Sequence, residues 1–189
     1  MLTLWLARRY VLRCKQLGSS TPDFVPTFLE LDRHLSVRTP AATSRRASCL
    51  IGVGMLRAYG ASFPSIKARL AEVKRSVLRA SSKEGFEAGN AACVFGLVAG
   101  LLGLGDKDAA RCYLYTVARD MVSAATRMNV VGPIQGQEVL ADVEGFIEAV
   151  AGLVVEGGEL DMNEVFVGGG IGDGLASAHE RLYSRLFNS

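Results

Sequence analysis

The sequence predicts an all-α fold, a single-domain helical bundle of about seven helices. Hydrophobic residues make up 49% of the 189 residues and charged residues 21%, with only five prolines, which is typical of a globular, helical chain. Apolar residues recur at steps of three and four in several segments, the period of an amphipathic helix. A chain of this length buries roughly 70% of its unfolded surface as one domain. We therefore expect residues 1–189 to form one domain.

Charge is distributed unevenly along the chain. Residues 1–57 carry nine Lys/Arg against three Asp/Glu, and residues 128–179 carry nine Asp/Glu and no Lys/Arg, although the net charge is only +2. Such polarity favours oriented docking onto other proteins over binding to nucleic acid. We expect neither nucleic acid nor a membrane as a partner.

The first 17 residues are apolar and basic. Arg8 and Arg9 interrupt the apolar run, so a secretory signal is not expected. Two alternatives stay open, an organellar transit peptide and a helix whose front has been cut off. Residues 19–26 are predicted to be a loop. A short amphipathic helix then follows, with Phe28, Leu31 and Leu35 on its apolar face.

Residues 44–58 are predicted to form the next helix, capped by Thr43 or Ser44. Its inward face is expected to consist of Ala47, Leu50, Ile51, Gly54 and Ala58. The glycines at 52 and 54 do not indicate a nucleotide-binding loop, because no strand precedes them and the chain contains no Gly-Lys-Ser/Thr.

A basic segment follows between residues 61 and 83, with six Lys/Arg against Glu72. Its helix, residues 65–79, has an apolar face of Ile66, Leu70, Val73 and Val77. An RNA-binding patch would need aromatic side chains that stack on bases, and none stands among these cations. A solvated face or a face that docks on an acidic partner remains.

The segment from Asn90 to Gln137 is predicted to contain a pair of buried helices. Its first part, NAACVFGLVAGLLGLG, is shorter than the roughly 20 apolar residues of a membrane span. Gly96 and Gly100 stand four apart, where another helix can approach closely, and Asn90 is a candidate helix cap. The second helix is predicted to start with Asp106 as its cap and to end near residues 127–129. Its apolar face is expected to consist of Ala110, Leu114, Val117, Met121, Ala124 and Met128.

Pro133 suits the first turn of a further helix. There the apolar residues are Leu140, Val143, Ile147, Val150 and Val154, while Glu138, Asp142, Glu144 and Glu148 populate the other face. Acids spaced so regularly along a helix exterior indicate a solvated or docking face and not a catalytic pair.

No catalytic, cofactor-binding or metal-binding residues are predicted. Cys14, Cys49, Cys93 and Cys112 lack the paired spacing of zinc ligands. We expect free, buried thiols in a reducing compartment, which indicates a cytoplasmic protein.

Residues 156–174 are acidic and glycine-rich and are predicted to be a flexible linker. Residues 175–189 are predicted to form a C-terminal docking helix with exposed aromatic residues. Its candidate partner-binding residues are Tyr183, Ser184, Arg185, Leu186, Phe187 and Ser189.

The string FGLVAGLLGL…YLY…RD…SAATR.N.VGP resembles the UreF family of urease accessory proteins, particularly its plant-type members. The resemblance runs from about Leu31 to Val154 and again over residues 175–189, while residues 1–30 match poorly. A histidine that is common in the family before its Phe-Gly pair is replaced here, where Asn90 and Ala91 stand. The family-motif residues are Arg45, Ser48, Gly52, Phe95, Gly96, Arg127, Gly132, Pro133 and Gln137.

The resemblance implies a non-enzymatic scaffold for urease maturation. It would bridge the UreH/UreD accessory protein and the UreG GTPase as a homodimer and deliver nickel to apo-urease, with nickel and GTP handled by the complex and not bound directly. The terminal residues would dock on the partner accessory protein. The resemblance also implies a longer N-terminal segment, so the chain is a candidate truncated gene model, isoform or fragment. The alternative function is a helical interaction module without urease function, such as a truncated or repurposed paralogue. A helical enzyme would need acid and base groups that the buried faces do not supply.

Overall fold

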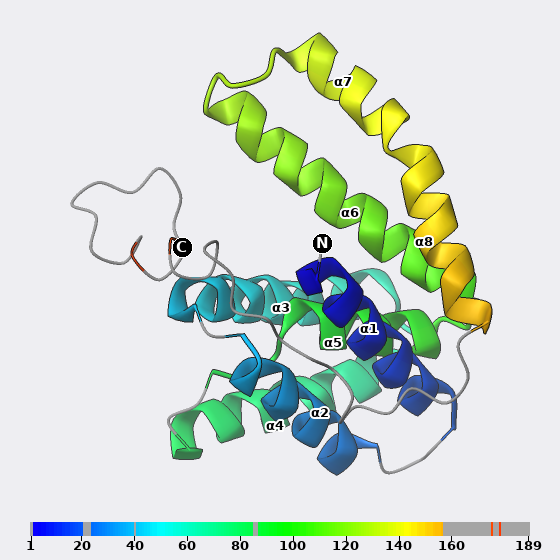
Figure 1. Ribbon diagram of the computed structural model, residues 1–189. Coiled ribbons are helices and arrows are strands. Elements are labelled where there is room, and N and C mark those ends of the chain that lie inside the picture. Colours follow the sequence, from blue (N-terminus) through cyan, green and yellow to red (C-terminus); the bar gives the residue numbers. More distant parts are fainter. Residues whose placement is uncertain are drawn as a thin grey trace. The chain divides into compact units, whose positions relative to one another are not determined.

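The computed structural model describes residues 2–20, 24–39, 41–84 and 87–156, together with Leu175 and Ala178 (Figure 1). Within these ranges the elements are eight α-helices, and no strand occurs among them. The prediction of an all-α fold is confirmed, with eight helices where about seven were expected. The helices are α1 (Leu2–Ser20), α2 (Val25–Val37), α3 (Ala42–Ser62), α4 (Lys67–Glu84), α5 (Ala91–Leu101), α6 (Asp106–Arg127), α7 (Pro133–Asp142) and α8 (Glu144–Glu156).

The chain divides into two compact units. The first contains residues 1–103 together with 162–189, and thus helices α1–α5. The second contains residues 104–161, and thus helices α6–α8. The single-domain boundaries expected from the sequence stay a prediction. The predicted linker after Glu156 and the predicted docking helix lie outside the described residues, apart from Leu175 and Ala178.

Close contact between α1 and α5 forms the centre of the first unit (Figure 1). A Cβ atom built on Gly96 would lie 2.1 Å from the carbonyl oxygen of Val11, and one on Gly100 would lie 2.1 Å from that of Lys15. Real Cβ atoms do not come this close to another atom, so only glycine permits this distance between the helices. The predicted close approach at these two glycines is confirmed, and its partner is α1.

The apolar face predicted for α4 is also confirmed, because Ile66, Leu70, Val73 and Val77 are all buried. The face predicted for α3 is wrong. Leu50 is 58% exposed and Ile51 is 51% exposed, and the buried residues are instead Thr43, Cys49, Gly52 and Leu56.

The reason is the contact at Gly52, where an added Cβ would lie 1.9 Å from the carbonyl oxygen of Gly89. Backbone packing against a glycine therefore sets the inward face of α3, and large apolar side chains do not. The predicted caps of this helix are wrong as well, since Ala41 occupies the cap position.

In the second unit α6 lies beside α7 and α8, which run back along it (Figure 1). The α6 face is buried at Ala110 and Leu114, but Met121 is 63% exposed and Met128 is also exposed, which corrects the predicted stripe towards its end. Gly105, not Asp106, holds the N-cap position of α6, and Asp106 is its first residue. Pro133 begins α7 as predicted, and Val143 separates α7 from α8.

No helix in the part of the chain that the structure describes is long and apolar enough to cross a membrane.

Candidate functional site

A buried hydrogen-bond cluster lies where α5 begins. The carboxylate of Asp32, from α2, is fully buried. It accepts hydrogen bonds of 2.7 Å from the backbone N–H groups of Gly89 and Asn90. The hydroxyl of Ser48, from α3, accepts a further bond of 3.1 Å from the N–H of Ala91. These groups satisfy N–H donors that a helix start leaves unpaired, and a carboxylate at this end of a helix is favoured by the helix dipole.

Asn90 occupies the N-cap position of α5, as predicted, but its side chain makes no capping hydrogen bond and instead contacts α2. Its Nδ2 donates to Asp32 Oδ1 at 3.0 Å and to Ser36 Oγ at 2.8 Å. Ser36 in turn donates to the carbonyl oxygen of Glu87 at 3.2 Å. Asn90 is thus a buried cross-link between α2 and α5.

The ionisation of Asp32 follows from its surroundings. Burial raises the pKa of the carboxyl, while the hydrogen bonds from Gly89 and Asn90 oppose that rise. Because the carboxyl is enclosed and its oxygens are occupied, the cluster stabilises the α2–α5 junction and offers no group to a substrate.

His34 is also engaged within the first unit. Its Nδ1 is hydrogen-bonded to the hydroxyl of Tyr10, and its Nε2 to the guanidinium of Arg38. Burial, together with the positive charge of Arg38, lowers the pKa of His34. With both ring nitrogens in use, the imidazole joins α1 and α2 and is not presented as a metal ligand.

The four cysteines are free thiols, and three of them, Cys14, Cys49 and Cys93, are buried. Burial raises the pKa of Cys49 to about 12 and that of Cys93 well above its usual range. The fourth, Cys112, is exposed on α6, which corrects the expectation that all four are buried. Among the described residues no three His, Cys, Asp or Glu side chains are grouped so that they could hold a metal ion.

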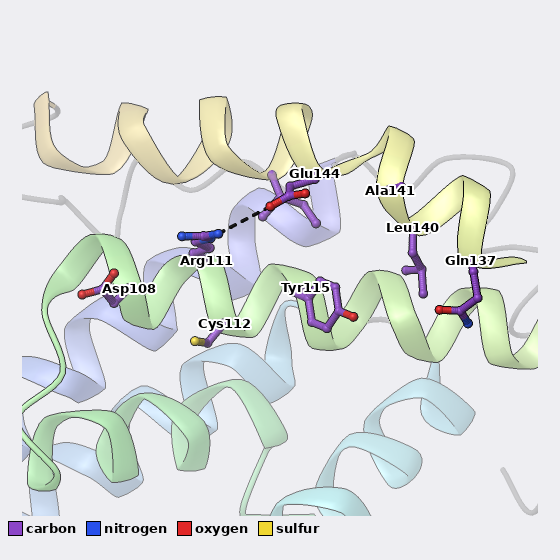
Figure 2. Close-up of a pocket in the computed structure, with 9 residues that line it drawn as sticks. Asp108, Arg111, Cys112, Tyr115, Gln137, Leu140, Ala141 and Glu144 are labelled. Carbon is purple, nitrogen blue, oxygen red and sulfur yellow. Dashed lines mark ion pairs between the residues drawn. The ribbon is translucent and has the colours of Figure 1, made fainter.

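The second unit contains an open groove between α6 and the α7–α8 pair, with a volume of about 570 Å³. Figure 2 shows Asp108, Arg111, Cys112 and Tyr115 on one wall and Gln137, Leu140 and Glu144 on the other. Leu140 and Ile147 are buried beneath it, and Tyr115 is half exposed. A mixed apolar and polar lining of this kind suits a side chain of another protein.

Ion pairs join the two walls at one end of this groove. Arg111 lies 3.5 Å from Glu144 and 3.4 Å from Glu148 (Figure 2 draws the former), and Lys107 also pairs with Glu148. The hydrogen bond from Lys107, with the charge of Arg111, lowers the pKa of Glu148. Glu144 and Glu148 therefore pair with α6, but their side chains stay 69% and 42% exposed, so the predicted solvated face holds.

A second groove of about 520 Å³ continues towards the turn between α6 and α7 and shares Gln137 and Leu140 with the first. Large apolar side chains stand out beside this turn, with Val130 72% and Ile134 78% exposed. Exposed apolar groups gathered in this way are typical of a protein interaction surface.

Comparison with known proteins identifies the family. A family model described as UreF matches residues 6–144, well over half of the chain. The chain belongs to the UreF family.

Relatives within the UreF family include plant and bacterial proteins. The chain is 31% identical over 174 residues to "Urease accessory protein F" of Arabidopsis thaliana, covering 89% of this chain and 67% of that protein. The protein of the same name from Oryza sativa subsp. indica is 29% identical over 174 residues, covering 90% of this chain and 62% of the rice protein. "Urease accessory protein UreF" of Haemophilus influenzae (strain ATCC 51907 / DSM 11121 / KW20 / Rd) is 26% identical over 162 residues, which are 85% of this chain and 64% of that protein.

The match to the UreF family starts earlier in the chain than expected, and the chain covers only part of the length of its relatives. The match begins at residue 6, well before Leu31, where the resemblance was expected to begin. The chain spans about 62% of the length of the rice relatives.

The predicted UreF-family motif residues fall into two groups. Those in the first unit make structural contacts: Gly52 and Gly96 allow backbone approach, Ser48 accepts from Ala91, and Arg45 donates to the carbonyl oxygen of Thr39 at 2.7 Å. Phe95, on α5, is half-buried. Those in the second unit surround the second groove, which Arg127, Pro133 and Gln137 line. Gly132 donates its N–H to Gln135 Oε1 at 3.2 Å and caps α7.

Asp32 and Ser36 were missed by the sequence analysis. The signal for Asp32 in the sequence was its position directly beside Leu31 of the apolar stripe. An acid that is buried there needs hydrogen-bonding partners. The six predicted partner-binding residues at the end of the chain lie outside the described residues, and their role stays a prediction.

Proposed function

We propose that this chain is a urease accessory protein that works as a non-enzymatic scaffold. The observation that carries the proposal is the UreF family match over residues 6–144. Names of the plant and bacterial relatives refer to urease accessory proteins. Since the chain spans about 62% of the rice relatives' length, the activity of the whole protein is part of the proposal.

In this proposal the chain bridges a UreH/UreD-type accessory protein and a UreG-type GTPase, and it contacts apo-urease during nickel delivery. Hydrolysis of GTP by the UreG-type partner controls release of nickel, and the chain itself holds neither nickel nor GTP. We place the homodimeric state and the cytoplasmic location in the same proposal.

The structure offers support of two kinds. Glycine-mediated contact of α1 with α5 makes a dense core in which polar groups such as Asp32 are satisfied internally. The α6–α8 unit instead presents grooves and exposed apolar side chains. A dense core with separate exposed surfaces suits a protein whose work is binding.

One observation favours the alternative of a helical interaction module without urease function. Asn90 and Ala91 lie in the stretch where members of the family commonly have a histidine. The side chain of Asn90 is buried and hydrogen-bonded to Asp32 and Ser36. A role that needs an exposed imidazole there is not open to this chain. In that case the chain would bind other proteins through the same surfaces.

Co-purification of the full chain with a UreH/UreD-type and a UreG-type protein tests the proposal. We expect a complex with the first partner alone and a larger complex with both. Deleting residues 183–189 is expected to abolish binding to the accessory partner while the helical content measured by circular dichroism is retained. Asp142→Ala, an exposed change on α7, serves as a control that leaves binding unchanged.

Failure to bind either partner, at concentrations where the Arabidopsis relative binds, would reject the urease role and favour the alternative. Binding that survives the deletion would show that the terminal residues are not the docking segment.

A further inference from the structure

The outward face of α4 carries cations that the described part of the protein does not neutralise. Lys67, Arg75 and Arg79 are exposed and Lys74 is half-buried. Their spacing places Arg75 and Arg79 opposite the buried Ile66, Leu70, Val73 and Val77, while Lys67 and Lys74 lie along one edge of that buried face. We call Lys67, Lys74, Arg75, Leu78 and Arg79 the basic α4 face.

Several other cations of the first unit have partners. Arg46 pairs with Glu87 at 3.3 Å, Arg45 donates to Thr39, and Arg69 lies over the ring of Phe24 at 5.9 Å. On the basic α4 face, none of the four cations has an ion pair or hydrogen bond to a described residue. Arg75 and Arg79 are one turn apart, so their like charges destabilise the isolated helix.

The face also has an apolar element, because Leu78 is 48% exposed between these cations. Alternation of cations with an exposed leucine over three turns suits a ligand that is both acidic and apolar. No aromatic side chain lies on α4, so stacking on the bases of single-stranded nucleic acid has no platform there.

We propose that the basic α4 face is a docking surface for an acidic amphipathic helix of a partner protein. Carboxylates of that helix would pair with Arg75, Arg79 and Lys74, and an apolar residue would cover Leu78. The basic α4 face would bind such a helix whether or not the chain serves urease, because its charge and exposure belong to the first unit alone.

The probe is a synthetic helical peptide with Glu at every fourth position and Leu beside it. Fluorescence anisotropy of the labelled peptide measures its binding to the full chain. The salt concentration is about 0.15 M, where the Debye length is about 8 Å. We expect Arg75→Glu to weaken binding about fivefold and Lys74→Glu/Arg75→Glu/Arg79→Glu at least about thirtyfold, since each lost pair is also replaced by repulsion. Arg57→Glu is the matched control, because Arg57 is an exposed arginine on α3 and the net charge changes equally.

Retention of binding in Arg57→Glu, with loss in Arg75→Glu, would support the proposal. Equal weakening by both changes would overturn it, because attraction would then depend on net charge alone. Tighter binding of single-stranded RNA or of phosphatidylserine vesicles through the same residues would overturn it in favour of another class of partner. A change in oligomeric state of the triple variant, measured by light scattering, would assign the face to a second copy of this chain and overturn it too.

Discussion

The contact of α1 with α5 and the contact of α6 with α7 and α8 join helices by different physical means. In the first, glycines bring two backbones together, so that Gly96 and Gly100 have carbonyl oxygens where a side chain would stand. In the second, side chains fill the space, and exposed ion pairs such as that of Arg111 with Glu144 span a groove. The α1–α5 contact has no room for a side chain at Gly96 or Gly100. The contact of α6 with α7 and α8 leaves an open groove that a partner could enter.

The glycine contact predicts the largest effect of a single substitution. Gly96→Ala would place a Cβ 2.1 Å from the carbonyl oxygen of Val11, so α1 and α5 must separate. We expect a loss of about 3 kcal/mol or more in the free energy of unfolding, measured with urea, as for severe overpacking. Gly145→Ala on α8 is the control, because nothing lies within 4 Å of its added Cβ, and we expect a gain of about 0.5–1 kcal/mol. Equal effects of the two changes would contradict the comparison.

The buried cluster predicts the next largest effect. Asp32→Ala leaves the N–H groups of Gly89 and Asn90 buried without their acceptor, and we expect a loss of about 2 kcal/mol. The same change at the exposed Asp142 of α7 should lie within about 0.5 kcal/mol of the unaltered chain. Urea denaturation compares the free energies of unfolding of the two variants. If Asp32→Ala left this free energy unchanged, the cluster would not stabilise the fold.

Thiol reactivity distinguishes the two regions by solvent access. At neutral pH we expect a thiol reagent to modify Cys112 rapidly in the folded protein, because it alone of the four cysteines is exposed. All four should react after denaturation. Burial that raises the pKa of Cys49 to about 12 also keeps it in the unreactive thiol form. Rapid modification of Cys49 or Cys93 in the folded chain would show that the first unit is not closed as described.

The smallest effect concerns acid titration of the groove. The folded-state pKa of Glu148 is lowered by Lys107 and Arg111, so the stabilisation from this pair is fully present above the unfolded pKa of about 4.3. It is lost as pH falls through the lower folded pKa. We expect Lys107→Gln to raise the pKa of Glu148 towards its usual value, followed by NMR of its carboxyl, and Arg127→Gln to leave it unchanged. An unaltered titration in Lys107→Gln would contradict the ion pair.

Sequence periodicity was sufficient where side chains alone decide burial. The α4 face of Ile66, Leu70, Val73 and Val77 is an example. The approach of α5 to another helix was predicted from the spacing of Gly96 and Gly100, and not from periodicity. Periodicity failed on α3, because packing of Gly52 against the Gly89 carbonyl turns Leu50 and Ile51 outward. A backbone contact with a distant loop leaves no trace in the period of apolar residues.

The candidate site was predictable only in part. Family resemblance identified Ser48, Gly52 and Gln137, but their contacts depend on which helices meet, and one sequence does not give that. Asp32 satisfies donors 57 and 58 residues away, so its role emerges only once α2 and α5 are adjacent. The pairing of Arg111 with Glu144 and Glu148 likewise requires the reversal of the chain after α6.

The central claim, that this UreF-family chain supports urease maturation as a scaffold, is tested most directly in cells whose own UreF-type gene has been deleted. Nickel content and activity of urease purified from those cells are the measurements, with the Arabidopsis relative as positive control. We expect expression of this chain to restore both, and expression of Gly96→Ala, which separates α1 from α5, to restore neither. The claim would be contradicted if urease stayed nickel-free and inactive in cells where the chain is folded and as abundant as the Arabidopsis relative.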